Sequence, residues 1–246
     1  MPYTIICLLT FAFCLLPFTF CLLPFAFCHM LYSICGNKSY LCIRMQKNHQ
    51  INLTGIILAG GKGIRLGRNK GMAELNGRHL IEYVVDNLKQ ACDEILVSSN
   101  SEQCKKFGLP VIPDQYHAKG PMAGIHACLQ AAKNEHCFVV SVDTPFVGPE
   151  FIRFMLEAKK DGLIAAPWYG KDQYEPLCAY YNKDALPVME AFFKKGNYKL
   201  PDVFMSLPFT PVKIPADASF QHEMLFHNIN TEEDLLRAEQ YLKNKA

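Results

Sequence analysis

The sequence predicts an α/β fold that is Rossmann-like, with a mostly parallel sheet and helices on both faces. Two observations lead to this prediction. From residue 45 onward, short apolar runs that suit buried strands alternate with segments that suit amphipathic helices. Half of the 246 residues are hydrophobic, which is enough for a substantial core. We expect residues 45–246 to form a single domain.

The first elements follow from apolar runs and their end signals. The run 54–59 predicts a strand, and the glycines after it end that strand. Apolar residues at 80, 81, 84, 85 and 88 fall on one helical face, so we expect a helix over 80–89. Strands follow at 94–98 and at 111–112, where Pro113 ends the second one.

The later elements continue the alternation. A helix is predicted over 121–133, with proline in its first turn, and another over 149–160. Strands are predicted at 137–142, 163–167 and 177–181. The last predicted helix, 231–243, begins at a capping Thr231, and the three acidic residues that follow suit the positive end of the helix dipole.

The first 44 residues differ in composition from the rest. They contain two basic residues and no acidic one, and cysteine recurs at every seventh position from 7 to 42. A heptad coiled coil does not account for this period, because Pro17 and Pro24 would break its helix.

Three interpretations of this segment are open. It is long and apolar enough for a membrane anchor. A signal peptide is the second, although the basic n-region is missing. The third is an apolar heptapeptide-repeat extension, translated from a tandem DNA repeat upstream of a true start at Met45. We favour the third, in which residues 1–44 are not part of the native protein, and we expect membrane contact only if they are.

Charge and cysteine usage narrow the class of protein. The net charge is +2, so no basic excess indicates nucleic acid or an anionic membrane as a partner. The cysteines after residue 45 show no C-x-x-C spacing, which favours buried thiols in a reducing compartment over disulfides or a zinc site. We therefore expect a cytoplasmic protein. These cysteines are Cys92, Cys104, Cys128, Cys137 and Cys178.

The most informative stretch is 58–70, with the sequence LAGGKGIRLGRNK. Its four glycines leave backbone N–H groups open to a ligand with no Cβ in the way, and Arg65 and Lys70 add positive charge. Such a loop just beyond the carboxyl end of a strand suits a phosphate-rich ligand. A glycine-rich turn with two solvated basic residues is the alternative.

Two common glycine fingerprints do not fit this loop. A P-loop closes with Gly-Lys-Ser/Thr, whereas Lys70 is followed by Gly71. A dinucleotide-binding loop has a glycine three positions after Gly63, where this chain has Leu66.

Acidic residues follow two later strands. Asp114 comes after the strand at 111–112, and Asp143 comes directly after the strand at 137–142. Ligands of parallel sheets bind beyond the carboxyl ends of the strands. A buried carboxylate is costly unless it is paired, so Asp143 is expected to bind Mg²⁺, which uses one or two carboxylates together with substrate phosphates. The alternatives are a helix cap for Asp143 and a solvated loop position for Asp114.

The stretch 58–70 resembles L-A-G-G-x-x-x-R-[LM]-G-x-x-K, a signature of nucleotidyltransferases, and its two-glycine form is most similar to that of the molybdenum cofactor guanylyltransferases. Three further motifs resemble this family in the expected order: GPMAG at 120–124, DTP at 143–145 and NINTEEDL at 228–235. The resemblance implies a nucleotide-diphospho-sugar transferase-like fold for 45–246.

The resemblance also implies roles for individual residues. Leu58, Ala59, Gly60 and Gly61 would bind the guanine nucleotide, and Gly61 favours guanine over other bases. Asp114 would lie in the nucleoside site. The catalytic residues would be Arg65 and Lys70, which stabilise the leaving pyrophosphate, and Asp143, which binds the nucleotide and Mg²⁺. Lys70 would also bind the phosphates of the nucleotide.

Other positions are less determined. Some family members contact the nucleotide through an asparagine of the second strand, and this chain has Ser98 there with Asn100 two residues later. Asn228 and Asn230 are either active-site amides or turn residues. An acceptor region or an ordinary loop would contain Lys171, Tyr174 and Glu175.

The implied activity is transfer of GMP from GTP to the terminal phosphate of Mo-molybdopterin, with release of pyrophosphate and formation of the molybdenum guanine dinucleotide cofactor. GTP is then a substrate and Mg²⁺ the cofactor, and transient contacts with molybdoenzymes or cofactor-delivery proteins are expected. The alternatives are a cytidylyltransferase, a sugar- or polyol-phosphate nucleotidyltransferase of the same fold, and a non-catalytic nucleotide-binding protein.

Overall fold

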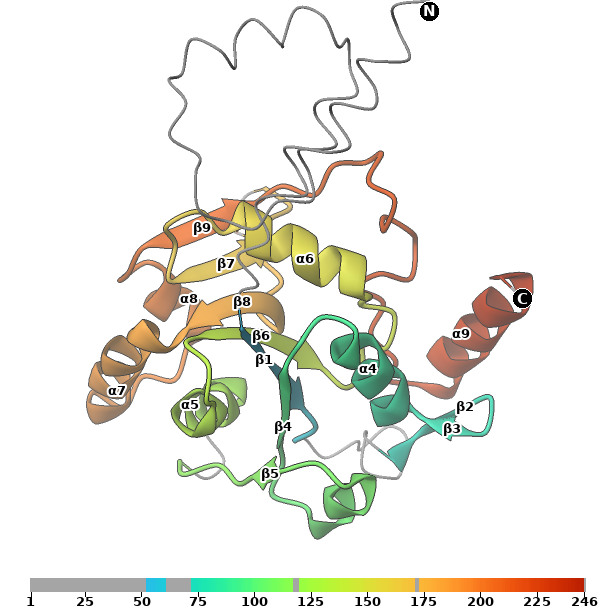
Figure 1. The fold of residues 1–246 in the computed structure, drawn as a ribbon, viewed down its shortest axis with the longest axis horizontal. Coiled ribbons are helices and arrows are strands. Elements are labelled where there is room, and N and C mark those ends of the chain that lie inside the picture. The colour runs from blue at the N-terminus through green and yellow to red at the C-terminus, as the bar shows by residue number, and fades with distance from the viewer. Residues whose placement is uncertain (1–51, 61–71, 117–119, 171–172, 246) are drawn as a thin grey trace, which may run out of the picture. The chain divides into compact units, whose positions relative to one another are not determined.

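The computed structural model describes residues 52–60, 72–116, 120–170 and 173–245 (Figure 1). Seven strands form one sheet in the order β5-β4-β1-β6-β8-β7-β9, and β2 and β3 form a separate hairpin. The strands are β1 (Leu53–Leu58), β2 (Glu74–Leu75), β3 (Arg78–His79), β4 (Glu94–Ser98), β5 (Val111–Ile112), β6 (His136–Ser141), β7 (Ile164–Pro167), β8 (Cys178–Asn182) and β9 (Phe209–Val212). The α-helices are α4 (Leu80–Lys89), α5 (Pro121–Ala131), α6 (Pro149–Ala158), α7 (Leu186–Lys194), α8 (Leu200–Phe204) and α9 (Glu232–Lys245).

The sheet is mostly parallel, as predicted. Only β8 differs in direction, because it runs antiparallel to both of its neighbours, β6 and β7. The strands β5, β4, β1 and β6 are adjacent and parallel, so their carboxyl ends lie side by side at one edge of the sheet. The amino end of β8 lies at this same edge. The name "carboxyl edge" is used for it below.

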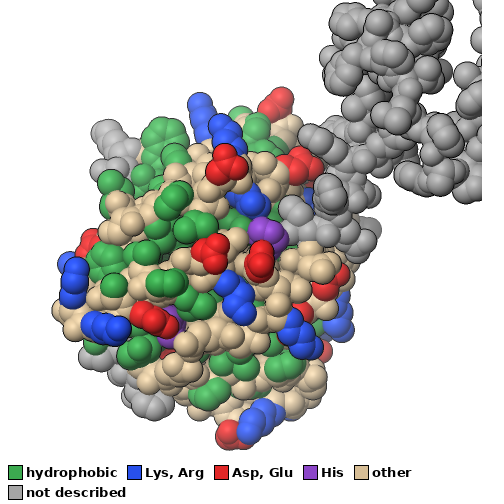
Figure 2. Space-filling view, turned by 60° about the vertical axis from the view of Figure 1, so that its left-hand side comes forward, with side chains coloured by type: hydrophobic (Ala, Val, Ile, Leu, Met, Phe, Trp, Pro, Cys, Tyr) green, Lys and Arg blue, Asp and Glu red, His purple; other side chains and the backbone are tan. Residues whose placement is uncertain are grey.

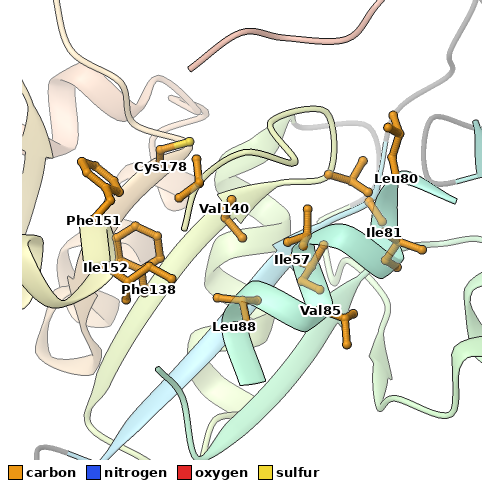
Figure 3. Close-up of a cluster of buried hydrophobic side chains, with 14 of the residues drawn as sticks. Ile57, Leu80, Ile81, Val85, Leu88, Phe138, Val140, Phe151, Ile152 and Cys178 are labelled. Atoms are coloured by element: carbon orange, nitrogen blue, oxygen red, sulfur yellow. The ribbon is translucent and has the colours of Figure 1, made fainter. Parts of the chain in front are cut away.

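Helices cover both faces of the sheet, which confirms the predicted fold class. Along β6, Phe138 and Val140 pack with residues of α4, α6 and α9, and Figure 3 shows part of this cluster. Cys137 and Val139, which alternate with them, pack with residues of α5, α7 and α8. A strand covered on both sides needs apolar residues at every position, which is why the central strands are continuous apolar runs in the sequence.

The predicted elements are all present, with small shifts in their bounds. α4, β4 and β5 have the predicted bounds, β1, β6 and β8 are displaced by one residue, and β7 begins one residue later than predicted. The structure adds α7, α8, β9, the short helices η2 (Glu102–Phe107) and η3 (Lys183–Ala185), and the β2–β3 hairpin. Asn76 and Gly77 have φ of 50° and 73° in that hairpin, as a type I′ turn requires.

None of the helices in the described ranges is long and apolar enough to cross a membrane. The first 44 residues, with the three interpretations offered for them, lie outside the described residues. On the face of the described part seen in Figure 2, basic and acidic side chains are interspersed.

Candidate active site

The centre of the carboxyl edge is the end of β1. The N–H of Ala59 donates to the carbonyl of Ser98 at 3.0 Å, and the N–H of Val142 donates to the carbonyl of Leu58 at 3.1 Å. These bonds hold the end of β1 between the ends of β4 and β6. Gly60 is exposed just beyond, and a Cβ placed on it would meet no described atom within 4 Å. Gly60 carries no Cβ that would shield its backbone from a ligand.

Three of the predicted site residues lie outside the described residues. They are Gly61, Arg65 and Lys70, and their roles stay predictions. The structure does describe Leu58, Ala59, Gly60, Asp114 and Asp143, and it brings all five to the carboxyl edge.

Asp114 is held in place by the end of β4. Its carboxylate accepts hydrogen bonds from Ser98 Oγ at 3.3 Å and from Asn100 Nδ2 at 3.2 Å. Its backbone N–H donates to Asn100 Oδ1 at 3.0 Å. Ser98, where the family resemblance led us to expect an asparagine, thus orients Asp114, and Asn100 makes a second contact from two residues further along.

The GPMAG motif places α5 against this group. Gly120 has φ of 71° and ψ of −167°, a backbone conformation that is essentially restricted to glycine. A Cβ on Gly124 would lie 2.3 Å from Ser98 Oγ and 3.2 Å from Asp114 Oδ1. Both positions therefore require glycine: Gly120 adopts the backbone conformation that starts α5, and Gly124 lets the helix approach Ser98 and Asp114.

Asp143 lies at the end of β6 and is 6% exposed. Its carbonyl accepts a hydrogen bond from the N–H of Ile229 at 2.8 Å. Thr144 turns the chain away from the sheet, since its N–H and its Oγ1 both donate to the carbonyl of Ser141. β5 and β6 are three strand spacings apart, so Asp114 and Asp143 stand about 14 Å from each other along the edge.

Glu175 lies beside Asp143, although it comes from the segment before β8. Its side chain is half-buried. Burial raises the pKa of the Glu175 carboxyl, and the negative charge of Asp143 raises it further. The Glu175 carboxyl therefore lies within reach of the negative charge of Asp143 at the carboxyl edge.

The turn before α9 is attached to the same strand end through Ile229. Within it, Asp234 Oδ2 accepts from the backbone N–H groups of Asn230 and Thr231, and Thr231 Oγ1 accepts from the N–H of Asp234. This reciprocal cap confirms the predicted start of the last helix. Asn228 is exposed and Asn230 is half-buried beside the site.

The three residues suggested for an acceptor region, Lys171, Tyr174 and Glu175, do not share one environment. Lys171 lies outside the described residues. The ring of Tyr174 packs edge-on against Phe209, with centroids 5.0 Å apart, and against Phe204 at 6.3 Å. Tyr174 thus packs against the hydrophobic core. Of Tyr174 and Glu175, only Glu175 lies next to Asp143.

A metal ion at this edge would be bound mainly by carboxylate oxygens. Within the described ranges, no group of three or more His, Cys, Asp or Glu side chains is placed to hold a metal ion. Mg²⁺ does not need such a cage, because it commonly uses one or two carboxylates, water and substrate phosphates. The carboxylate of Asp143 at the end of a buried strand fits that kind of site.

The cysteines after residue 45 are free thiols, and all except Cys92 are buried. Burial raises the pKa of Cys92, Cys137 and Cys178 to about 12. They stay protonated near neutral pH, as expected of thiols that pack in a core.

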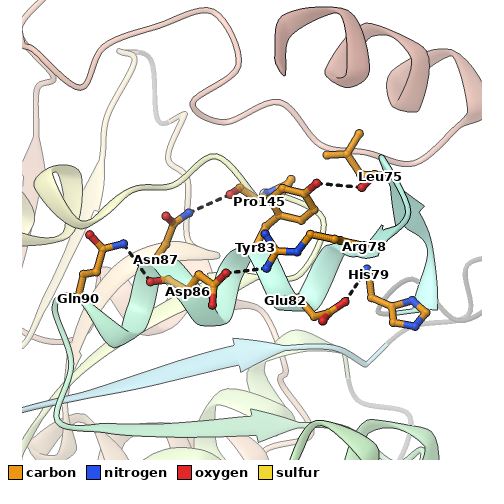
Figure 4. Close-up of polar contacts among 9 residues, drawn as sticks. All are labelled: Leu75, Arg78, His79, Glu82, Tyr83, Asp86, Asn87, Gln90 and Pro145. Atoms are coloured by element: carbon orange, nitrogen blue, oxygen red, sulfur yellow. Dashed lines mark hydrogen bonds and ion pairs between the residues drawn. The ribbon is translucent and has the colours of Figure 1, made fainter. Parts of the chain in front are cut away.

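α4 supports the loop that follows Asp143, as Figure 4 shows. Asn87 Nδ2 donates to the carbonyl of Pro145 at 3.0 Å. On the same side, a cavity of about 480 Å³ lies between α4, the start of α6 and α9. Neither Asp114 nor Asp143 lines this cavity, so it is separate from the candidate site.

Comparison with known proteins agrees with this arrangement. Residues 55–208 match the family described as "MobA-like NTP transferase domain". A probable molybdenum cofactor guanylyltransferase from Pelotomaculum thermopropionicum is 32% identical over 199 residues, which cover 79% of this chain and 95% of the relative.

Solved structures give the same picture. The crystal structure of molybdopterin-guanine dinucleotide biosynthesis protein A from Archaeoglobus fulgidus is 30% identical, with a TM-score of 0.67, and the match covers 78% of this chain and 99% of that one. A 2-C-methyl-D-erythritol 4-phosphate cytidylyltransferase from Thermus thermophilus shares the fold at 17% identity, with a TM-score of 0.56 over 76% of this chain and 98% of that one. The chain belongs to the MobA-like NTP transferase family.

Proposed function

We propose that this chain transfers GMP from GTP to the terminal phosphate of Mo-molybdopterin, which releases pyrophosphate and forms the molybdenum guanine dinucleotide cofactor. The observation that carries the proposal is the meeting of Gly60, Asp114 and Asp143 at one sheet edge, in a chain of this family whose full-length relatives are named for that reaction.

The length of the site suits a nucleoside triphosphate. Asp114, oriented by Ser98 and Asn100, stands at one end of the edge and would bind the nucleoside. Asp143 stands at the other end, where the α-phosphate would lie. The backbone of Leu58, Ala59 and Gly60 lies between them and would line the nucleotide.

The reaction asks mainly for positioning and for stabilisation of negative charge. The attacking group is a phosphate monoester that is already largely ionised near neutral pH, so no general base on the protein is required. Arg65 and Lys70 would neutralise the departing pyrophosphate, and the fixed end of β1 would hold the α-phosphate in line with its acceptor.

We assign Asp143 as the protein ligand of Mg²⁺. When bound, Mg²⁺ supplies Lewis-acid stabilisation of phosphate oxygens. Asp143 suits this role because its backbone is anchored on both sides, by the end of β6 and by Ile229, so its carboxylate is presented with little freedom. We also place the reaction in the cytoplasm and expect transient contact with proteins that receive or deliver the cofactor.

A nucleotide panel tests the proposal. The full chain is incubated with Mg²⁺, Mo-molybdopterin and GTP, CTP, UTP or ATP, and pyrophosphate release is measured. We expect GTP to be preferred. A preference for CTP or UTP would replace the guanylyltransferase assignment with one of the rival transferases, and GTP binding without turnover would support the non-catalytic alternative.

The role of Asp143 is tested separately. Asp143→Ala should lower turnover by orders of magnitude, since a metal ligand is lost. Asp161→Ala is a matched control, because Asp161 is exposed and precedes β7 at the opposite edge of the sheet. Near-normal turnover of Asp143→Ala would refute the metal assignment.

A further inference from the structure

The pairing of β6 with β8 brings a second carboxylate into the turn next to the one that carries Asp143. In this antiparallel ladder Val140 pairs with Cys178 and Val139 with Ala179. Asp143 lies three residues past Val140, and Glu175 lies three residues before Cys178. Both residues therefore lie in the turns that leave these two neighbouring strand ends, at the carboxyl edge of the sheet.

One contact joins the two segments at the end of the ladder, and two backbone hydrogen bonds fix Glu175. Thr144 Oγ1 lies 3.4 Å from Cys178 Sγ, which joins the residue after Asp143 to the start of β8. The N–H of Cys178 donates to the carbonyl of Glu175 at 3.3 Å, and the N–H of Glu175 donates to the carbonyl of Pro167 at 3.1 Å. Both backbone groups of Glu175 are thus engaged, so its side chain starts from a fixed point.

Glu175 has an acidic neighbour among the described residues. Its side chain is half-buried, and the negative charge of Asp143 acts on its carboxyl. Within the part of the chain that the structure describes, no Lys, Arg or His side chain forms an ion pair with Glu175. Two neighbouring carboxylates at a site for phosphate chemistry form a donor set for a hard divalent cation.

We propose that Glu175 is a second protein ligand of the divalent cation and faces Asp143 across it. The proposal rests on the proposed function, because it requires Asp143 to hold the same ion. It makes the site a pair of carboxylates drawn from two strands of opposite direction, with substrate phosphates and water completing the coordination.

Metal binding by the full chain tests this directly. Mn²⁺ is used as the probe in the presence of a non-hydrolysable GTP analogue, and bound ion is counted by electron paramagnetic resonance. Glu175→Gln keeps the size of the side chain and removes its charge, and Asp143→Asn does the same for its partner. Glu135→Gln is the matched control, because Glu135 is exposed next to the opposite end of β6.

We expect the Kd for Mn²⁺ to rise at least about tenfold in Glu175→Gln and in Asp143→Asn, and to stay within about twofold in Glu135→Gln. An unchanged Kd in Glu175→Gln, with a weakened Asp143→Asn, overturns the inference and leaves the proposed function intact. Unchanged values in both variants refute the metal assignment of Asp143 as well.

A second variant keeps the test decisive if Glu175→Gln does not fold. Glu175→Asp retains the charge but withdraws the carboxylate by one methylene, so its Kd for Mn²⁺ should also rise, by less than in a variant without the charge. A wild-type Kd in Glu175→Asp contradicts direct coordination. Thermal melting without metal shows whether each variant is folded before its Kd is measured.

Discussion

Gly124→Ala is the substitution that most directly tests how α5 organises the candidate site. The new Cβ would lie 2.3 Å from Ser98 Oγ, 3.2 Å from Asp114 Oδ1 and 3.3 Å from Ser98 Cβ. Ser98 is 3% exposed, so its side chain has no solvent-filled space into which it can move. Either Ser98 rotates away from Asp114 or α5 shifts outward.

Two opposing effects set the magnitude. Overpacking in a close-packed region costs about 1–3 kcal/mol. Replacing glycine by alanine inside a helix stabilises the folded state by about 0.5–1 kcal/mol. The net loss of unfolding free energy is therefore about 0–2.5 kcal/mol. GTP binding should weaken as well, because the hydrogen bond from Ser98 that orients Asp114 is lost. Such a bond contributes about 0.5–1.5 kcal/mol, which corresponds to up to about a tenfold loss of affinity.

Urea denaturation and GTP titration calorimetry measure the two effects. A second substitution, Ser98→Ala, removes the oxygen that clashes, so the double variant should be more stable than Gly124→Ala alone, which is a non-additive result. Gly148→Ala controls for the added methyl, because its Cβ would meet no atom of the described residues within 4 Å, and it should leave GTP affinity unchanged. If Gly124→Ala binds GTP with wild-type affinity, and the stability changes of Gly124→Ala and Ser98→Ala simply add in the double variant, the proposed clash with Ser98 is refuted.

Two further predictions concern stability. Gly120→Ala forces a side chain into a conformation with φ of 71° and ψ of −167°, so the free energy of unfolding should fall by about 1–3 kcal/mol in urea titrations, and no change would argue against that backbone geometry. Burial lowers the pKa of three histidines below 6.5, so the folded state favours their neutral form. Their contribution to the free energy of unfolding is therefore complete above pH 6.5, and it is lost as the pH falls through the lowered pKa values. Melting temperatures should therefore decrease on acidification, less so in the His→Gln variants of His126, His136 and His222.

The elements predicted from sequence are those with strong apolar runs and clear end signals. α4 combines five apolar positions on one face with an acidic first turn, and its bounds were predicted without error. β9 was missed because it contains Pro211, which is tolerated in a strand only where its missing N–H is not needed, as at the edge of this sheet. The β2–β3 hairpin was missed although Asn76–Gly77 is a strong turn signal, because its strands have two residues each.

Strand direction explains why Asp114 and Asp143 could be predicted as site residues from the sequence and why Glu175 could not be assigned. Parallel strands deliver the residues that follow them to the ligand edge, so Asp114 and Asp143 were recognisable from their positions after apolar runs. An antiparallel strand delivers the residues that precede it. β7 and β8 are joined without a helix, and strands joined in this way pair antiparallel, as β7 and β8 do here. Once the direction of β8 is known, Glu175 before it becomes equivalent to an acidic residue after a parallel strand, and the pairing of Val140 with Cys178 brings its turn next to the turn of Asp143.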